Sequence, residues 1–185
     1  MNDELIKITL RILGYPLALA IAVVVLTIKK RSLKDSFALK AISWRDAFLW
    51  LMWFIPVLIA GEVWYFGLGL NEGRIWHYTL PVAVIRALGI IILAPICEEL
   101  IFRGILFKVI SDARPGPIGA VILTSVIFTA IHYQYGILDW LPIFIDAFYW
   151  AWVRYKTGST ILPIVMHLFG NTIAVVELLW LNKIV

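Results

Sequence analysis

Long apolar runs separated by short polar segments make up most of the chain. A membrane-spanning helix needs about 20 mainly apolar residues, and six runs are candidates for such helices. The predicted spans cover residues 12–28, about 47–70, 79–110, 117–136, 140–153 and 160–181. A 3.6-residue period is weak inside them, as is typical of bundle helices that are apolar on nearly all sides. The pattern predicts an all-α, polytopic transmembrane helix bundle of about six spans, with residues 1–185 forming a single integral membrane domain.

The segments between the runs predict how the helices are oriented. Segments 29–46, 108–114 and 154–156 together hold ten Lys or Arg residues and three acidic ones. The remaining connections and ends (1–11, 71–77, Asp139 and Lys183) hold four basic and four acidic residues. Cytoplasmic loops carry the excess of Lys and Arg, so the first three segments are predicted to be cytoplasmic and both termini external. Basic residues follow the first apolar run instead of preceding it, so that run is predicted to be a retained helix and not a cleaved signal peptide.

Composition narrows the class of protein further. Hydrophobic residues make up 62% of the chain and charged residues 15%, whereas average soluble domains have about 45–50% and about 25%. The single cysteine, Cys97, excludes a disulfide framework and a multi-cysteine zinc site. The net charge of +4 arises mainly beside the apolar runs, where membrane topology accounts for it. We therefore expect the lipid bilayer, and no nucleic acid, as a partner.

Several charged residues lie inside the predicted spans, where each is costly unless it is paired or hydrated. They are Glu62, Arg86, Glu98, Glu99, Arg103, Asp146 and Glu177. Glu99 and Arg103 are four residues apart on one helix face, which predicts an internal ion pair and leaves Glu98 to point elsewhere. Pro95 lies just before them, and a proline inside a helix frees a carbonyl and bends the helix, which can admit water.

The other charges inside the spans are most simply structural. Glu62 and Asp146 are expected to face water or an arginine such as Arg86. Glu177 lies near a helix end, where its carboxylate can extend to the membrane surface. Cys97 directly precedes Glu98, but a buried cysteine usually behaves as a small hydrophobic residue. None of these residues is therefore predicted to carry the chemistry, and the roles of Asp146 and Cys97 stay open.

Two histidines and an asparagine fall at a depth comparable to that of Glu98. His132 lies in the fourth predicted span, four residues after Phe128, and His167 lies in the sixth, one turn before Asn171. At 1.5 Å per residue, Glu98 and His132 are each about 20 Å from the cytoplasmic ends of their helices. The sequence thus predicts one polar layer within the membrane. Its members are Glu98, Glu99, His132, His167 and Asn171.

This set of groups suits hydrolysis. A carboxylate and an imidazole that share one water form a general-base system, and His and Asn donors on a second helix can stabilise an oxyanion. The sequence holds no His-Glu-x-x-His zinc motif, no Gly-x-Ser-Gly nucleophile motif and no Gly-x-Gly-Asp aspartyl motif. Ser125 lies seven residues before His132, nearly two helical turns away, so a Ser–His dyad is not favoured.

Three short motifs resemble those of the CAAX-protease and bacteriocin-processing (CPBP, or Abi) family of glutamic intramembrane proteases. Ala94-Pro-Ile-Cys-Glu98-Glu99-Leu-Ile-Phe-Arg103-Gly104 is similar to the family's first motif, Glu-Glu-x-x-x-Arg. Phe128-Thr-Ala-Ile-His132 is similar to the second, Phe-x-x-x-His, and His167-Leu-Phe-Gly-Asn171 to the third, His-x-x-x-Asn. The motifs occur in the family's order, and the resemblance covers about residues 82–180.

The resemblance implies an intramembrane endopeptidase that uses a glutamate-activated water and forms no covalent intermediate. It implies that Glu98 is the base, that His132 assists it, and that His167 and Asn171 form the oxyanion hole. Glu99 and Arg103 would hold the geometry of the site. No cofactor is expected, although Zn²⁺ bound by His and Glu ligands stays an open alternative.

The expected substrate is a membrane protein or peptide precursor, and a bacterial precursor is favoured over a prenylated one. The expected location is a bacterial cell (inner) membrane, which the chain would cross several times. Two other functions stay open: a non-catalytic scaffold or regulator of a membrane partner, and a small ion-coupled carrier. The sequence does not indicate the identity of the substrate or the oligomeric state.

Overall fold

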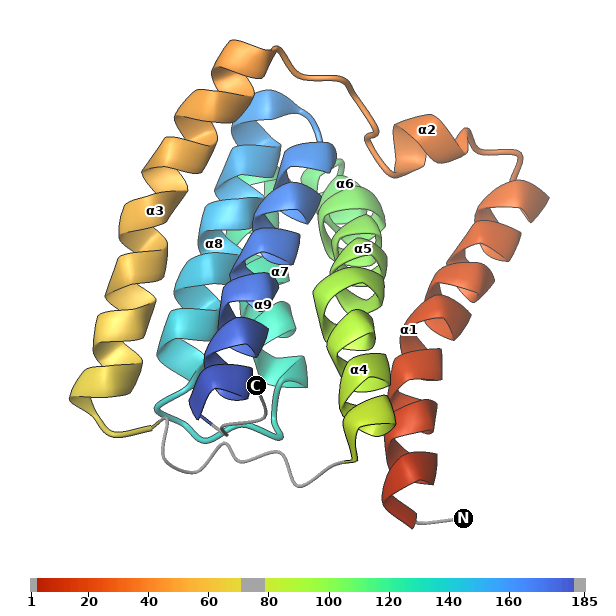
Figure 1. Cartoon of the computed structure of the whole chain (residues 1–185). Coiled ribbons are helices and arrows are strands. Elements are labelled where there is room, and N and C mark those ends of the chain that lie inside the picture. Colours follow the sequence, from red (N-terminus) through yellow and green to blue (C-terminus); the bar gives the residue numbers. More distant parts are fainter. Residues whose placement is uncertain (1–2, 71–78, 182–185) are drawn as a thin grey trace.

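The computed structural model describes residues 3–70 and 79–181, and all the regular structure in that part of the chain is helical. The helices are α1 (Asp3–Ile28), α2 (Leu33–Ser36), α3 (Trp44–Gly67), α4 (Leu80–Leu88), α5 (Ala94–Glu99), α6 (Phe107–Ser111), α7 (Gly116–Ile131), α8 (Trp140–Thr157) and α9 (Ile161–Leu181). The wider π-helical turns η1 (Gly89–Leu93) and η2 (Leu100–Leu106) join α4 to α5 and α5 to α6. The predicted all-α bundle is confirmed (Figure 1).

Three continuous helical stretches are long and apolar enough to cross a membrane. They are Trp44–Gly67, Leu80–Ser111 and Ile161–Trp180. Two shorter apolar stretches, Ile12–Ile28 and Gly116–Ile131, belong to α1 and α7. Each of the six predicted spans therefore corresponds to a helix, and the chain has the character of an integral membrane protein. That all six cross the bilayer stays a prediction.

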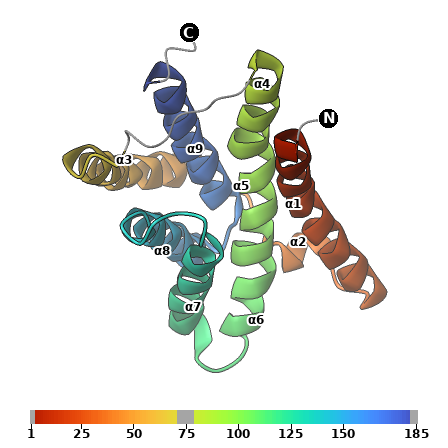
Figure 2. The ribbon, with the colours of Figure 1, turned by 90° about the horizontal axis from the view of Figure 1, so that it is seen from below.

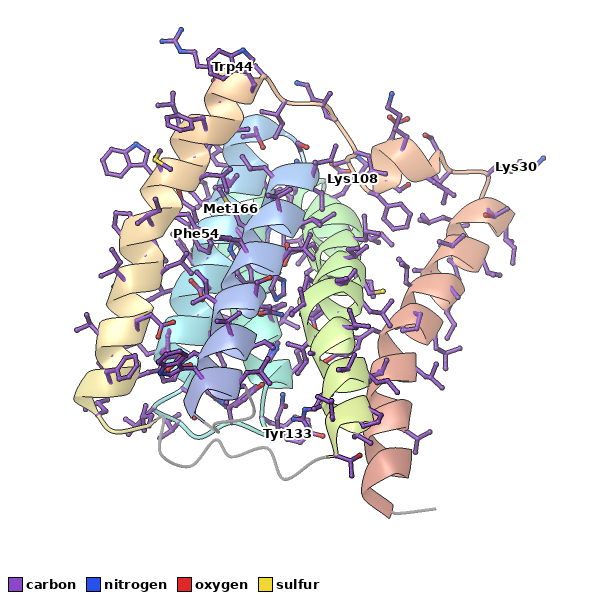
Figure 3. All side chains as sticks on the ribbon, in the orientation of Figure 1. Lys30, Trp44, Phe54, Lys108, Tyr133 and Met166 are labelled. Atoms are coloured by element: carbon purple, nitrogen blue, oxygen red, sulfur yellow. The ribbon has the colours of Figure 1, made fainter. Side chains whose placement is uncertain are left out.

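The stretch from α4 to α6 is one continuous helix at the centre of the bundle. Seen from below, it lies between α1 on one side and α7 and α9 on the other (Figure 2). Its middle turn, α5, is buried, including both glutamates. Buried side chains of the surrounding helices close the core; among them, Phe54 of α3 and Met166 of α9 lie on facing helices (Figure 3). The central helix thus carries charged side chains into the interior.

The two ends of the bundle differ in charge. The basic segments 29–46, 108–114 and 154–156 all lie at the end where α1, α6 and α8 finish, whereas α1 begins and α9 finishes at the opposite end (Figure 1). Lys30 and Lys108 mark the basic end and Tyr133 marks the other (Figure 3). The grouping of segments predicted from charge agrees with this arrangement. Segment 71–77 and Lys183, which were assigned to the other side, lie outside the described residues.

Helix α7, which corresponds to the fourth predicted span, is shorter than the sequence predicts. Its run was expected to continue to residue 136, but α7 ends at Ile131 and His132 follows it outside the helix. The His132 N–H bonds back only three residues, to the Thr129 carbonyl, and the Tyr135 N–H bonds in turn to the His132 carbonyl. Consecutive turns of this kind replace the helical pattern in the polar, glycine-containing stretch 132–136. His132 therefore lies at a helix end and not within a span.

Cysteine labelling tests which end of the bundle faces the cytoplasm. With Cys97→Ser as the background, Asp112→Cys at the basic end is expected to react only after the membrane is permeabilised. Ile137→Cys is exposed in the connection between α7 and α8, which lies at the opposite end. It is expected to react with an impermeant maleimide in intact cells, because the basic loops are retained inside. Labelling of the residue-112 variant in intact cells would contradict the orientation.

Candidate active site

One oxygen of Glu99 holds together the polar groups at the centre of the bundle. Glu99 Oε1 accepts a hydrogen bond from Arg103 Nη1 at 3.0 Å and another from His167 Nδ1, also at 3.0 Å. The side chains of Glu99 and Arg103 are fully buried, so the predicted ion pair is present in a water-poor interior. Because Glu99 is ionised against Arg103, it can only accept at His167, and the imidazole proton is assigned to Nδ1. The sequence did not predict this second contact of Glu99.

The Arg103 guanidinium is held by three further groups from other helices. Its Nη2 donates to the Ala147 carbonyl of α8 at 2.8 Å. Its centre lies 4.6 Å from the Phe128 ring and 5.4 Å from the Trp150 ring, which is within the range of cation–π attraction. The ion pair therefore connects the central helix to α7 and α8 and is more than a bond along one helix face.

His167 presents its second nitrogen to Glu98. The imidazole stacks on Trp150, with ring centroids 4.1 Å apart, and Phe128 meets it edge-on at 5.8 Å. With the Nδ1 proton given to Glu99, Nε2 carries a lone pair and lies 3.8 Å from Glu98 Oε2. This separation exceeds a direct hydrogen bond, and polar groups at such a distance are often bridged by water. Glu98 is thus the carboxylate that is separate from Arg103, as the helical spacing predicted.

Asn171 fills a gap in the backbone hydrogen bonds of the central helix. In η1 the bonds run over five residues, since the Ala94 N–H donates to the Gly89 carbonyl. The next bond in this register would run from residue 95 to the Ile90 carbonyl, but Pro95 has no N–H. Asn171 Nδ2 donates to that carbonyl at 2.8 Å instead. The proline does free a carbonyl, as predicted, and a side chain of α9 takes its place.

His132 is set apart from the carboxylates. Its Nδ1 donates to the Phe128 carbonyl at 2.7 Å, and its ring lies 4.6 Å from the Phe128 ring. Because Phe128 also touches His167, the two imidazoles contact the same phenyl ring. Within the described residues no hydrogen bond joins His132 to Glu98. The predicted polar layer is therefore drawn together around Glu98, Glu99 and His167, with Asn171 one turn away and His132 beside it.

Two aromatic residues near the carboxylates were not found from the sequence. Trp150 lies outside the three motifs, and it is buried against His167 and Arg103. Tyr15 of α1 is hydrogen-bonded to Glu98. Tyr15 lies in an uncharged run outside the three motifs, so no sequence signal connected it to the site. The other acidic pair inside the bundle brings Asp146 of α8 near Glu62 of α3.

A zinc site is not supported by the donor groups in place. Within residues 3–70 and 79–181, no three His, Cys, Asp or Glu side chains are grouped so that they could hold a metal ion. The Nδ1 atoms of His132 and His167 are both committed to protein acceptors, and the carboxylate nearest to Arg103 is already paired with it. The residues present therefore do not fit a zinc ion.

The fold and the site together define the class of protein: an integral membrane helical bundle with a buried, charged site at its centre. Comparison with known families places the chain more closely. Residues 43–173 match the family described as "Type II CAAX prenyl endopeptidase Rce1-like". The match covers more than half of the chain, and the chain belongs to this family. The membership predicted from the three motifs is confirmed.

Two bacterial relatives were found among known proteins. The chain is 33% identical over 98 residues to an "Uncharacterized 24.3 kDa protein" of Escherichia coli, a match that covers 51% of this chain and 45% of that protein. It is 27% identical over 147 residues to the "UPF0177 protein YajF" of Lactococcus lactis subsp. lactis (strain IL1403), which covers 74% of this chain and 70% of that protein. The first match thus spans less than half of its relative's length. No solved structure matches the chain.

Removing Arg103 is expected to destabilise the fold as well as the site. Arg103→Ala leaves Glu99 charged in a buried position, and breaking one side of a buried pair typically costs about 3–5 kcal/mol. The double variant Glu99→Gln/Arg103→Met removes both charges and is expected to recover much of the folded yield. Thermal unfolding in detergent measures the difference. A double variant as unstable as Arg103→Ala would contradict the role of the pair.

Asn171 and Pro95 are expected to be coupled in stability. Asn171→Ala leaves the Ile90 carbonyl unpaired, which costs about 1–3 kcal/mol for a buried group. Pro95→Ala supplies a backbone N–H to that same carbonyl, so the Pro95→Ala/Asn171→Ala double variant is expected to be more stable than Asn171→Ala alone. A double-mutant cycle on thermal stability measures this coupling. Additive losses would show that the two residues act independently.

Proposed function

We propose that this protein is an intramembrane endopeptidase in which Glu98 activates the water that attacks the peptide bond. The observation that carries the proposal is that two adjacent carboxylates make different contacts. Glu99 is committed to Arg103 and His167, whereas Glu98 faces the unprotonated Nε2 of His167 across 3.8 Å. A water bonded to both atoms would have two acceptors for its protons, which is the arrangement that general-base catalysis requires.

The surroundings of this pair support a hydrated site. Within the described residues, Glu99 Oε2 and Arg103 Nε have no hydrogen-bond partner although they are buried. Buried polar atoms of this kind are usually satisfied by water. Stacking on Trp150 fixes the plane of the His167 ring, so Nε2 stays directed at Glu98. Restricting the base and its partner in this way reduces the entropy lost on reaching the transition state.

The remaining residues take supporting roles in this proposal. Asn171 uses one N–H for the Ile90 carbonyl, and its second N–H is the proposed oxyanion donor. Glu98 takes the proton of the attacking water and passes it to His167 Nε2, 3.8 Å away, and His167 would then donate that N–H to the oxyanion. His132, held through Nδ1 by the Phe128 carbonyl, keeps Nε2 for a proton on the substrate side. Glu99 and Arg103 position these groups.

The proposed substrate is a membrane-associated protein or peptide precursor. The description of the family names an endopeptidase for prenylated CAAX chains. The relatives found come from Escherichia coli and Lactococcus lactis, which supports a location in a bacterial cell membrane and a bacterial precursor as substrate. The site lies in the buried middle of the central helix, so the scissile bond would have to enter the bundle.

Glu98→Gln is expected to abolish cleavage while the protein stays folded, because the amide keeps the shape of the side chain but cannot take a proton from water. The matched control is Glu177→Gln, which removes a carboxylate from another apolar helix and is expected to leave cleavage unchanged. Membrane peptides that accumulate uncut in a deletion strain, measured by mass spectrometry, provide the readout. His132→Ala is also expected to lower cleavage strongly, because it removes the group proposed to transfer a proton on the substrate side.

Two results would contradict this mechanism. Full complementation of the deletion strain by Glu98→Gln, with normal folding, would favour a non-catalytic scaffold instead. Loss of cleavage by the purified protein on treatment with a chelator, restored by Zn²⁺, would favour a metal-dependent reaction. Cleavage that survives chelation and is lost only on replacing Glu98 would agree with the proposal.

A further inference from the structure

A cleft of about 620 Å³ lies at the basic end of the bundle, away from the carboxylates. It is bounded by α2 and the loop after it, by α6 with the start of α7, and by the end of α8. Its charged lining residues are Lys34, Asp35, Lys40, Lys108, Asp112 and Arg154. None of these residues belongs to the three motifs, and the proposed reaction does not use them.

The charges in the cleft do not cancel. Lys108 and Asp112 form an ion pair at 2.9 Å, which removes one charge of each sign. The other basic residues, Lys34, Lys40 and Arg154, then face a single carboxylate, that of Asp35. No ion pair of these three is found within the described residues. The cleft therefore has an excess of positive charge that an anion can satisfy.

Arg154 is oriented at the wall of this cleft. Its Nε donates to the Arg103 carbonyl at 2.9 Å, and its guanidinium lies 5.0 Å from the Phe107 ring. One of five N–H groups is thereby used, and no other hydrogen bond of this side chain is found in the described part of the chain. The planar guanidinium group is suited to paired hydrogen bonds with phosphate oxygens.

The wall of the cleft that is formed by the loop after α2 is fixed by contacts between distant parts of the chain. Ser159 Oγ donates to the Lys40 carbonyl at 2.5 Å, which joins the loop after α2 to the connection between α8 and α9. Phe37 is buried against Gly104 of the central helix, where a Cβ would lie 3.0 Å from the Phe37 Cα. The loop is thus a packed part of the fold, and Lys40 is held in a defined place. A site of this kind is preorganised for a ligand.

We propose that this cleft binds the headgroup of an anionic phospholipid. The end of the bundle that carries it also carries the exposed Trp44, as expected where a bilayer surface meets the protein (Figure 3). Next to the lining residues Lys108 and Pro117, the side chains of Val109 and Ile118 are exposed and apolar. A lipid can satisfy both features, because its phosphate would meet the cations while its acyl chains cover the apolar surface.

The contacts of Arg154 would link this lipid to the candidate active site through a single residue, Arg103. Arg154 bonds to the backbone carbonyl of Arg103, and the side chain of Arg103 bonds to Glu99. A headgroup bound to Arg154 would therefore steady the π-helical turn η2. Lipid binding itself does not depend on the proposed proteolysis and can be measured without it.

Native mass spectrometry of the full chain in detergent tests the site. The protein is titrated with phosphatidylglycerol and with phosphatidylcholine of the same acyl chains, and the first is expected to bind more tightly. Lys34→Gln/Lys40→Gln is expected to weaken phosphatidylglycerol binding by roughly tenfold or more, because each basic residue at an anionic surface contributes to the attraction. The matched control is Lys29→Gln/Arg31→Gln, which removes two charges at the same end but outside the cleft.

The control and a soluble anion separate the outcomes. Tight phosphatidylglycerol binding that is lost only in Lys34→Gln/Lys40→Gln would support the site. Equal losses in both double variants would mean that the whole basic end attracts the lipid. Unchanged binding in Lys34→Gln/Lys40→Gln would mean that the cleft does not bind the lipid. Either result overturns the proposal. Displacement of phosphatidylglycerol by equimolar inorganic phosphate would also overturn it, since the cleft would then take a soluble anion.

Discussion

Two buried donors, the Arg103 guanidinium and the His167 imidazole, meet on one oxygen of Glu99. In an apolar interior each of these groups would be costly alone, and their common acceptor makes the burial tolerable. The arrangement also fixes the protonation of His167 and the separation of Glu98 from Arg103. Four helices meet through this contact, because Arg103 reaches α8 and touches Phe128 of α7 while His167 comes from α9.

The central helix can carry this cluster because its backbone is not a regular α-helix. The π-helical turns η1 and η2 flank α5, and such turns commonly occur at functional sites. The widened turn before Pro95 exposes the Ile90 carbonyl to a donor from α9, which ties the third motif to the first through the backbone. A residue of the third motif thus has a structural contact that is separate from any contact with substrate.

The two ends of the bundle serve different purposes in this picture. The end where α1 begins and α9 finishes includes the turns after α7, where His132 lies. The basic end is closed by α2 and by a loop that packs against the central helix and the connection between α8 and α9. Arg154 joins that end to the interior through the Arg103 carbonyl. The charge that orients the protein in the membrane therefore also contributes to the packing next to the site.

The sequence by itself determined the class of fold and gave the residues of the candidate site as a prediction. Apolar run lengths predicted the helices, loop charges predicted which segments share an end, and the spacing of Glu99 and Arg103 predicted their ion pair, because these properties depend on neighbouring residues only. The end of α7, the bond from Glu99 to His167, the partner of the Ile90 carbonyl and the place of Trp150 and Tyr15 were decided by tertiary structure. Each depends on how separate helices approach one another, and no local pattern of residues encodes that approach.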